Sequence, residues 1–276
     1  MLTDFVAFLN RMLTGLFDLL LRPFLGLAPV WALALISLVT GVLMLWIFGK
    51  VSDQKAIRVV RDKIRGHLLG LRIFGDEIGL LMMLLGRSLR ATAVYMKYAV
   101  VPMLVMMIPV ALILIQMNLR FAVRPLKPGE KTVVTVKLHE APTSAAVELD
   151  VPSGLVLETT GVRVDSLKEV SWRIRAEEPG DYRLLVRSGG TETEKEVRVG
   201  AGWGSVSPLR TTNAMDLLLY PGEPPIDPEG PIESIRLSYD YLPIRVFGYH
   251  VNWLVGFFVA SIAFGFAFRK RLGVEI

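Results

Sequence analysis

Cysteine is absent from the chain, and histidine occurs only three times. Without cysteine the protein forms no disulfide bonds and has no cysteine-ligated metal or redox site. The histidines, His67, His139 and His250, fall in three segments that we predict to be separate, so we expect no metal centre built on them.

Recurrent catalytic motifs are missing as well. The sequence has no glycine-rich phosphate loop, no nucleophile elbow and no paired-carboxylate motif. These absences predict a protein that is not an enzyme and that uses no cofactor or metal.

Charged residues are present but unevenly distributed. The segment from Lys50 to Lys97 has ten Lys and Arg against four Asp and Glu, whereas residues 121–250 have fifteen against nineteen. The basic segment lies between two apolar runs, which makes nucleic acid a poor partner for it. Basic loops beside membrane spans are typical of the cytoplasmic side.

Three apolar runs are long enough to cross a bilayer, which takes about 20 helical residues. They cover residues 29–49, 98–119 and 251–268, in a chain that is 52% hydrophobic with a mean hydropathy of +0.47. The second run contains Pro102 and Pro109, and membrane helices tolerate interior prolines better than soluble helices do. The sequence therefore predicts an integral membrane protein with the bilayer as its first partner.

The distribution of basic residues predicts the orientation of the spans. Residues 50–97 and the tail 269–276 are expected in the cytoplasm, and the N-terminus and residues 120–250 outside. A prokaryotic cytoplasmic (inner) membrane is the expected location, with either a bacterial periplasm or the archaeal exterior on the outer side.

Residues 1–28 are predicted to contain an amphipathic helix that lies in the outer interface and ends at Pro23. Asp4, Arg11, Asp18 and Arg22 follow one helical stripe, and apolar residues fill the remaining face. A fourth membrane span is the alternative.

Residues 50–97 are predicted to form a basic helical hairpin that turns at Gly75, Asp76 and Glu77. Its second arm is apolar on nearly every face between Ile78 and Leu85. Because Arg87, Arg90 and Lys97 follow, we expect this arm to continue into the second span. Its apolar stretch either packs on the first arm or lies against the inner leaflet.

Residues 120–250 change to a two-residue alternation of apolar and polar side chains, which predicts strands. We expect strands at 132–138, 146–151, 169–175, 182–187, 195–199, 232–237 and 244–247, a loop at 201–230, and Trp172 in the core. Short strands at this spacing favour an immunoglobulin-like β-sandwich. The predicted fold class is thus an α+β membrane protein: three transmembrane helices, a cytoplasmic hairpin and an extracytoplasmic sandwich.

Polar side chains within or beside the spans are the candidates for a semi-polar groove. None of them is ionisable, which disfavours a proton relay or an ion pathway. They are Ser37, Thr40, Gln116, Asn118, Asn252 and Ser261. Ordinary hydrogen bonding between helices is the alternative role.

Seven of the eleven methionines fall between Met82 and Met117. Methionine side chains adapt to varied apolar partners, although plain core packing explains them equally well.

The arrangement resembles the YidC/Oxa/Alb superfamily of membrane protein insertases, especially its archaeal branch and the related subunit of the ER membrane complex. The likeness covers about residues 29–119 and depends on the basic hairpin and one motif. That motif comprises Met96, Lys97, Pro102, Met103, Leu104, Met107, Ile108 and Pro109. Bacterial members carry an arginine inside the groove, which this chain lacks in mid-span, and the outer sandwich is foreign to the family.

The resemblance implies insertion of membrane proteins without an energy source, with membrane-protein clients or nascent chains as partners. It also implies that the hairpin captures the client. The candidate capture residues are Arg58, Arg61, Arg65, Met82, Met83, Arg87 and Arg90. The alternative is a non-catalytic subunit of a larger membrane complex that uses the same scaffold and contacts other subunits through its outer β-domain.

Overall fold

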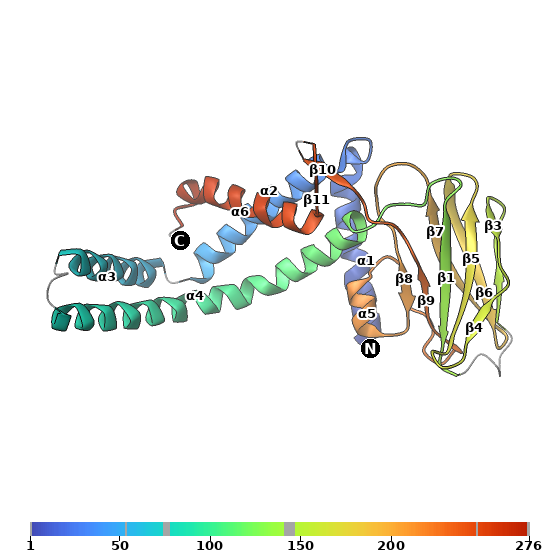
Figure 1. The fold of residues 1–276 in the computed structure, drawn as a ribbon, viewed down its shortest axis with the longest axis horizontal. Coiled ribbons are helices and arrows are strands. Elements are labelled where there is room, and N and C mark those ends of the chain that lie inside the picture. The colour runs from blue at the N-terminus through green and yellow to red at the C-terminus, as the bar shows by residue number, and fades with distance from the viewer. Residues whose placement is uncertain (1, 53, 74–77, 141–146, 247, 275–276) are drawn as a thin grey trace. The chain divides into compact units, whose positions relative to one another are not determined.

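The computed structural model describes residues 2–52, 54–73, 78–140, 147–246 and 248–274. The chain divides into two compact units. Unit 1 comprises Met1–Ala32 and Ile113–Trp253, and unit 2 comprises Leu33–Leu112 and Leu254–Ile276. Figure 1 shows the fold of the elements within each unit.

Unit 2 consists of helices. They are most of α2 (Pro29–Val51), α3 (Gln54–Ile73), the larger part of α4 (Ile78–Phe121) and α6 (Trp253–Leu272). Within the described residues, three segments are long and apolar enough to cross a membrane: Pro29–Val51, Met82–Phe121 and Trp253–Leu272. This finding confirms the three predicted apolar helices and is consistent with a membrane protein.

Helix α4 is continuous from Ile78 through Pro102 and Pro109 to Phe121. The second arm of the predicted hairpin therefore continues into the second apolar run, as predicted. The predicted turn at Gly75, Asp76 and Glu77 lies outside the described residues.

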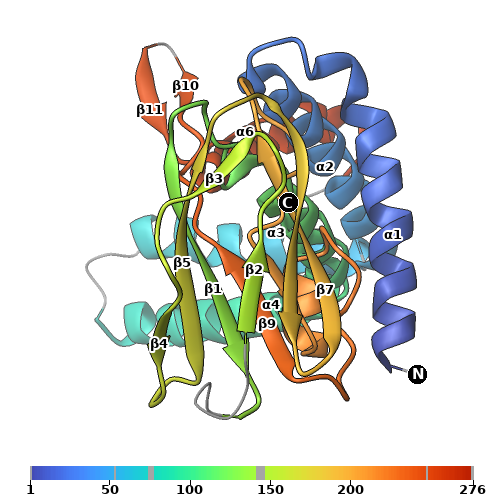
Figure 2. The same ribbon diagram turned by 90° about the vertical axis from the view of Figure 1, so that its right-hand side faces the viewer.

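Unit 1 contains the β-structure. One sheet has the strand order β3-β5-β1-β9-β8, with β4 paired to β5, and a second has the order β2-β6-β7. Figure 2, turned by 90° from Figure 1, shows most of these strands face-on. Their bounds are β1 Lys131–Leu138, β2 Val147–Asp150, β3 Leu155–Leu157, β4 Val162–Val164, β5 Glu169–Ala176, β6 Gly180–Ser188, β7 Thr191–Val199, β8 Leu209–Thr211 and β9 Ile232–Leu237. All the pairings between these strands are antiparallel.

Both sheets contribute to one hydrophobic core, as their alternating burial requires. Val134 and Ile174 come from the larger sheet and Leu184 and Val186 from the smaller one, and all four are fully buried. Trp172 is also buried in this cluster, which confirms its predicted place.

Several predicted boundaries were wrong in unit 1. The predicted loop 201–230 contains β8 and a short helix, α5 (Ala214–Leu219). Both are too short to show periodicity. Strand β8 is held by pairing to β9, and α5 begins where the Asn213 side chain accepts hydrogen bonds from the backbone N–H groups of Met215 and Asp216.

The last two predicted strands do not pair with each other. Strand β9 pairs with β1 and β8, whereas β10 (Ile244–Val246) pairs with β11 (Tyr249–Val251). The third apolar helix consequently begins at Trp253 rather than at residue 251, because Val251 is bonded within β11. Residues 146 and 247, at the ends of two predicted strands, lie outside the described residues.

The N-terminal helix α1 (Leu2–Leu21) presents its apolar face outward. Its polar side chains Asn10 and Thr14 bond to other parts of unit 1, to the carbonyl oxygen of Leu217 and to Gln116. One stripe of large apolar side chains is exposed: Phe5, Phe8, Met12, Leu16 and Leu19. The predicted amphipathic helix is therefore present, although Arg11 and Arg22 of the predicted polar stripe are exposed.

The chain enters and leaves the β-domain at one point. The backbone N–H of Arg124 donates to the carbonyl oxygen of Asp240 at 3.0 Å, and that of Leu242 donates to Ala122 at 3.2 Å. The Arg124 guanidinium donates to both carboxylate oxygens of Glu130 at 2.7 and 2.8 Å, and to Asp240 at 2.6 Å. These bonds close the base of the domain.

The Arg124–Glu130 pair predicts acid sensitivity. The hydrogen bonds from Arg124 lower the pKa of Glu130 to about 2. Because this pKa is depressed in the folded state, the pair stabilises the fold above the ordinary pKa of 4.5, and its contribution is lost as pH falls from there towards 2. Glu130→Gln should reduce the fall in unfolding free energy between pH 5 and 2. Urea unfolding of the full chain in detergent, repeated across this pH range, measures this change. An unchanged pH profile in this variant would contradict the assignment.

A buried ion pair predicts a larger loss of stability at neutral pH. Lys195 on β7 donates to Glu223 and to the carbonyl oxygen of Ser207, and both charged side chains are almost fully buried. Burial lowers the pKa of Lys195, and Glu223 opposes that shift. Glu223→Ala leaves the ammonium unpaired and should lower the unfolding free energy by about 3–5 kcal/mol.

The control for this prediction is the exposed pair of Arg187 and Glu192, whose nitrogen and oxygen lie 2.9 Å apart on the same sheet. Glu192→Ala should leave the thermal midpoint nearly unchanged, because exposed pairs contribute little. Equal losses in the two variants would show that burial of the Lys195–Glu223 pair is unimportant.

Candidate functional site

Helices α2 and α6 of unit 2 approach closely because small residues face each other. A Cβ atom on Gly41 would collide with the carbonyl oxygen of Ser261 and would lie 3.2 Å from the backbone nitrogen of Gly265. Small residues permit this contact between backbones, as they do in many membrane helix pairs. A second contact follows at Gly49, where a Cβ would lie 2.8 Å from the Val274 side chain.

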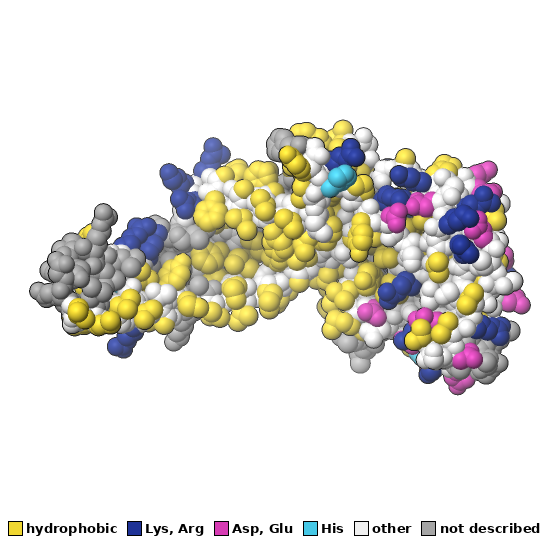
Figure 3. All heavy atoms as spheres, in the orientation of Figure 1, with side chains coloured by type: hydrophobic (Ala, Val, Ile, Leu, Met, Phe, Trp, Pro, Cys, Tyr) yellow, Lys and Arg dark blue, Asp and Glu magenta, His cyan; other side chains and the backbone are white. Residues whose placement is uncertain are grey.

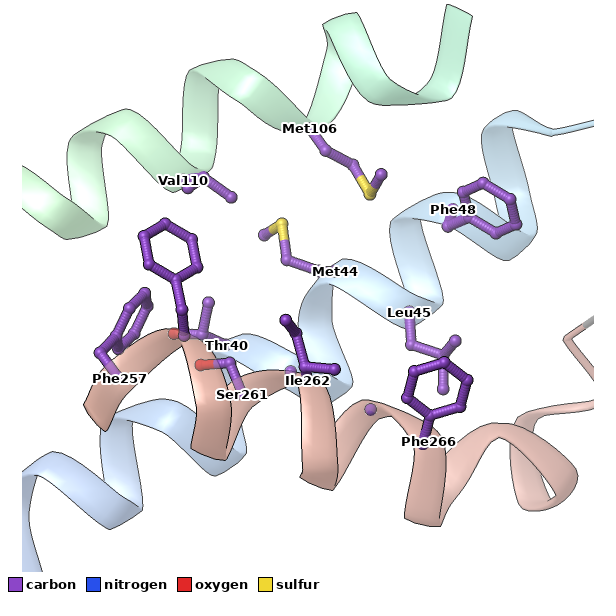
Figure 4. Close-up of a pocket in the computed structure, with 13 residues that line it drawn as sticks. Thr40, Met44, Leu45, Phe48, Met106, Val110, Phe257, Ser261, Ile262 and Phe266 are labelled. Atoms are coloured by element: carbon purple, nitrogen blue, oxygen red, sulfur yellow. The ribbon is translucent and has the colours of Figure 1, made fainter. Parts of the chain in front are cut away.

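An open groove of about 360 Å³ lies between this helix pair and α4. Helix α4 contributes Met106 and Val110, and α2 contributes Met44 and Phe48. Figure 4 shows the side chains of Met44 and Met106 extending towards the space between the helices. The apolar lining and its methionines suit a changeable apolar occupant rather than one of fixed shape.

Two of the sequence-predicted polar residues line this groove. They are Thr40 on α2 and Ser261 on α6, which Figure 4 places on the wall opposite α4. Ser37 is fully buried on α2 but does not line the groove. Within the described residues, the hydroxyl groups of Ser37 and Ser261 have no hydrogen-bond partner. Both hydroxyl oxygens are buried.

The remaining predicted groove residues belong to unit 1. Gln116 is fully buried and its amide nitrogen donates to the Thr14 hydroxyl at 3.2 Å. Asn118 lines a different cavity, beside the β-domain, and Asn252 is exposed just before α6. The structure therefore brings Thr40 and Ser261 together and places the other three in another unit.

Gln116 is part of a buried cluster around Arg120, which sequence reasoning missed. The Arg120 guanidinium donates to Asp18 at 2.5 Å, to the Thr14 carbonyl oxygen at 3.0 Å and to Gln116 Oε1 at 2.8 Å. It also lies over the Phe17 ring, 5.6 Å from the centroid. Arg120 lies at the end of an apolar run in the sequence. The one sequence signal for the cluster was its partner Asp18, which belongs to the predicted polar stripe of the N-terminal helix.

The predicted capture residues lie on α3 and on the first turns of α4. Arg58 and Arg65 on α3 are exposed, and Arg61 is half-buried, with its guanidinium 3.9 Å from Asp62. On α4, Met82, Met83, Arg87 and Arg90 are all exposed. Figure 3 shows hydrophobic and basic side chains over these helices, and the magenta of Asp and Glu over the β-domain.

Within the part of the chain that the structure describes, no three His, Asp or Glu side chains are grouped to hold a metal ion. Comparisons with models of known protein families, with curated proteins and with solved structures found no match to this chain.

The close contact of α2 and α6 at Gly41 predicts that a larger residue at this position lowers stability. Gly41→Ala forces α2 and α6 apart and should lower stability by about 1–3 kcal/mol, measured as the unfolding transition in detergent. The control is Gly66→Ala on α3, where nothing lies within 4 Å of the new Cβ. That change should be neutral or slightly stabilising, since alanine favours helix. A tolerant Gly41 and a sensitive Gly66 would contradict the crossing.

Proposed function

We propose that the protein is a membrane-embedded insertase-like chaperone that holds apolar segments of other membrane proteins in the groove of unit 2. The observation that carries the proposal is the open groove between α4 and the α2–α6 pair, whose exposed lining is apolar. A client helix would bury its apolar side there.

The methionine side chains of the groove suit occupants of varied shape. Met44 and Met106 face the space from opposite walls. Unbranched methionine side chains repack at little free-energy cost, so successive clients of different shape would fit the same walls. Holding and releasing such segments requires no catalytic residue, cofactor or external energy source.

The exposed side chains of α3 and the beginning of α4 are proposed as the capture surface. Arg58, Arg65 and Arg87 offer positive charge, and Met82 and Met83 offer adaptable apolar area. We propose that these helices form a cytoplasmic hairpin, because the basic residues that flank the spans favour that side. Nascent chains would meet this surface before they reach the groove.

The same orientation places unit 1 outside, in the periplasm or at the cell surface of a prokaryote. We propose an immunoglobulin-like sandwich for its β-domain, supported by two antiparallel sheets around one core that contains Trp172. Helix α1 would lie in the outer interface with its exposed apolar stripe in lipid, rather than span the membrane as a fourth helix. Its polar groups Asn10 and Thr14 are turned to the protein, as that position requires.

The resemblance to the YidC/Oxa/Alb superfamily supports the chaperone proposal through the α2–α3–α4 arrangement and the motif between Met96 and Pro109. One observation favours a second function. Among the described residues, no charged side chain lines the groove. An apolar groove suits the permanent helix of a partner, so the chain would then be a non-catalytic subunit of a membrane complex, with the β-domain contacting further subunits.

Site-specific photo-crosslinking distinguishes these functions. Benzoylphenylalanine replaces Met106 in the groove or, as the control, Ile108, which is exposed on α4 and does not line the groove. During synthesis of a single-span membrane protein into proteoliposomes, Met106 should crosslink the nascent chain several-fold more than Ile108, because only Met106 faces the bound segment. Insertion should also rise with the amount of reconstituted protein.

A crosslink from Met106 to one membrane protein at fixed stoichiometry, independent of translation, would instead establish the subunit function. Equal crosslinking from both positions together with unchanged insertion would contradict the chaperone proposal.

A further inference from the structure

A cationic cavity of about 450 Å³ lies in unit 1 beside the end of α1. Its lining includes three arginines and one acid: Arg22, Arg120, Arg198 and Asp18. Arg22 belongs to the 3₁₀ helix η1 (Arg22–Phe24), Arg120 to the end of α4 and Arg198 to β7. Segments far apart in sequence therefore bring positive charge to one place.

The three arginines differ in how far their charge is already compensated. Arg120 is buried and bonded to Asp18, so this pair is neutral. Arg198 donates to Asp181 at 2.8 Å and to the Ser205 carbonyl oxygen at 2.8 Å, with its side chain 42% exposed. Arg22 is exposed, and within the described residues it forms no ion pair. The cavity thus retains an uncompensated guanidinium at its edge.

The cavity adjoins two membrane-spanning segments. Trp203 lines it, stacks on Phe121 with the ring centroids 5.1 Å apart, and donates its indole N–H to the Leu27 carbonyl oxygen at 2.9 Å. Phe121 is the last residue of α4, and Leu27 is two residues before α2 begins. The cavity therefore lies beside the ends of two candidate spans, where a membrane has its headgroups.

Large apolar side chains surround the same opening. Leu19 is 72% exposed and Leu25 is 48% exposed, and both line the cavity. An arginine-lined cavity beside exposed leucines offers charge for a phosphate and apolar area for an acyl chain. A soluble anion would use only the first of these features, whereas a phospholipid would use both.

We propose that this cavity binds the phosphate headgroup of an anionic phospholipid of the outer leaflet. Arg22 is the cation that meets the phosphate, and Leu19 and Leu25 contact the acyl chains. The bound lipid would secure the junction between α1 and the first span. The site rests on the proposed membrane location of the spans and is independent of whether the groove of unit 2 receives clients.

Lipid binding to the purified full-length protein tests the site. Native mass spectrometry in detergent would compare phosphatidylglycerol with phosphatidylcholine, and we expect preferential retention of phosphatidylglycerol. Arg22→Gln should weaken phosphatidylglycerol binding about fivefold, as expected for one basic residue at a membrane surface. Arg22→Lys should restore most of the binding, because a lysine keeps the charge.

The matched control is Arg11→Gln, an exposed arginine on α1 that does not line this cavity. It should bind phosphatidylglycerol as the native chain does. Circular dichroism and the thermal midpoint of each variant verify folding, and Arg22 is exposed enough for both to stay unchanged. Insertion assays run on the same variants keep a failure of the chaperone proposal separate from a failure of this site.

Three outcomes would overturn the proposal. The first is equal retention of the two lipids, and the second is an equal loss in the Arg11→Gln and Arg22→Gln variants, which would indicate a general charge effect. The third is complete displacement of the lipid by millimolar inorganic phosphate, which would indicate a site for soluble anions.

Discussion

The buried guanidinium of Arg120 determines how unit 1 is assembled. It joins the last turn of α4 to α1 through Asp18 and the Thr14 carbonyl oxygen, and it holds the Gln116 side chain in the same cluster. A guanidinium removed from water requires nearly all of its donors to be bonded, so few positions of α1 are compatible with it. Helix α1 therefore presents Thr14 and Asp18 to Arg120 and its apolar stripe outward. The segment between α1 and α2 contacts Trp203 through the carbonyl oxygen of Leu27.

The helix unit depends on a different constraint, which is the size of side chains where α2 and α6 cross. Gly41 and Gly265 let two backbones approach, and this contact leaves α4 to form the other wall of the groove. The close α2–α6 pair and the neighbouring α4 together enclose the open groove. The stability of the pair and the shape of the groove are consequently linked, since any residue that separates α2 from α6 also changes the wall that Thr40 and Ser261 occupy.

Much of this architecture was predictable, because it follows from patterns that extend over many residues. Three long apolar helices, the amphipathic α1 and the strands β1, β2, β5, β6, β7 and β9 were all expected, as was Trp172 in the core. The short strands β3, β4, β8 and β11 and the short helix α5 were not. Strand β8 exists through its pairing to β9, and α5 through the Asn213 cap, and neither leaves a periodic signal.

The candidate site was only partly predictable for a related reason. Thr40 and Ser261 were predicted as groove residues because they are polar side chains within apolar runs. Gln116 was predicted for the same reason, but it bonds to Thr14 and Arg120 instead. The side chains that form most of the groove wall, such as Met106, Val110 and Phe257, are indistinguishable in sequence from residues that face lipid. Which face of an apolar helix meets a neighbour depends on the crossing at Gly41, and that crossing is a property of two segments distant in sequence.

The closure at the base of the β-domain has a consequence for how such a chain can arise. Because Arg124 and Asp240 are hydrogen-bonded neighbours, the more than one hundred residues between them begin and end at a single place on the fold. Exchange of this segment would therefore leave the length of the connection between α4 and α6 unchanged. Any replacement would still have to supply the contacts that Leu217 makes with α1 and that Trp203 makes with Leu27 and Phe121.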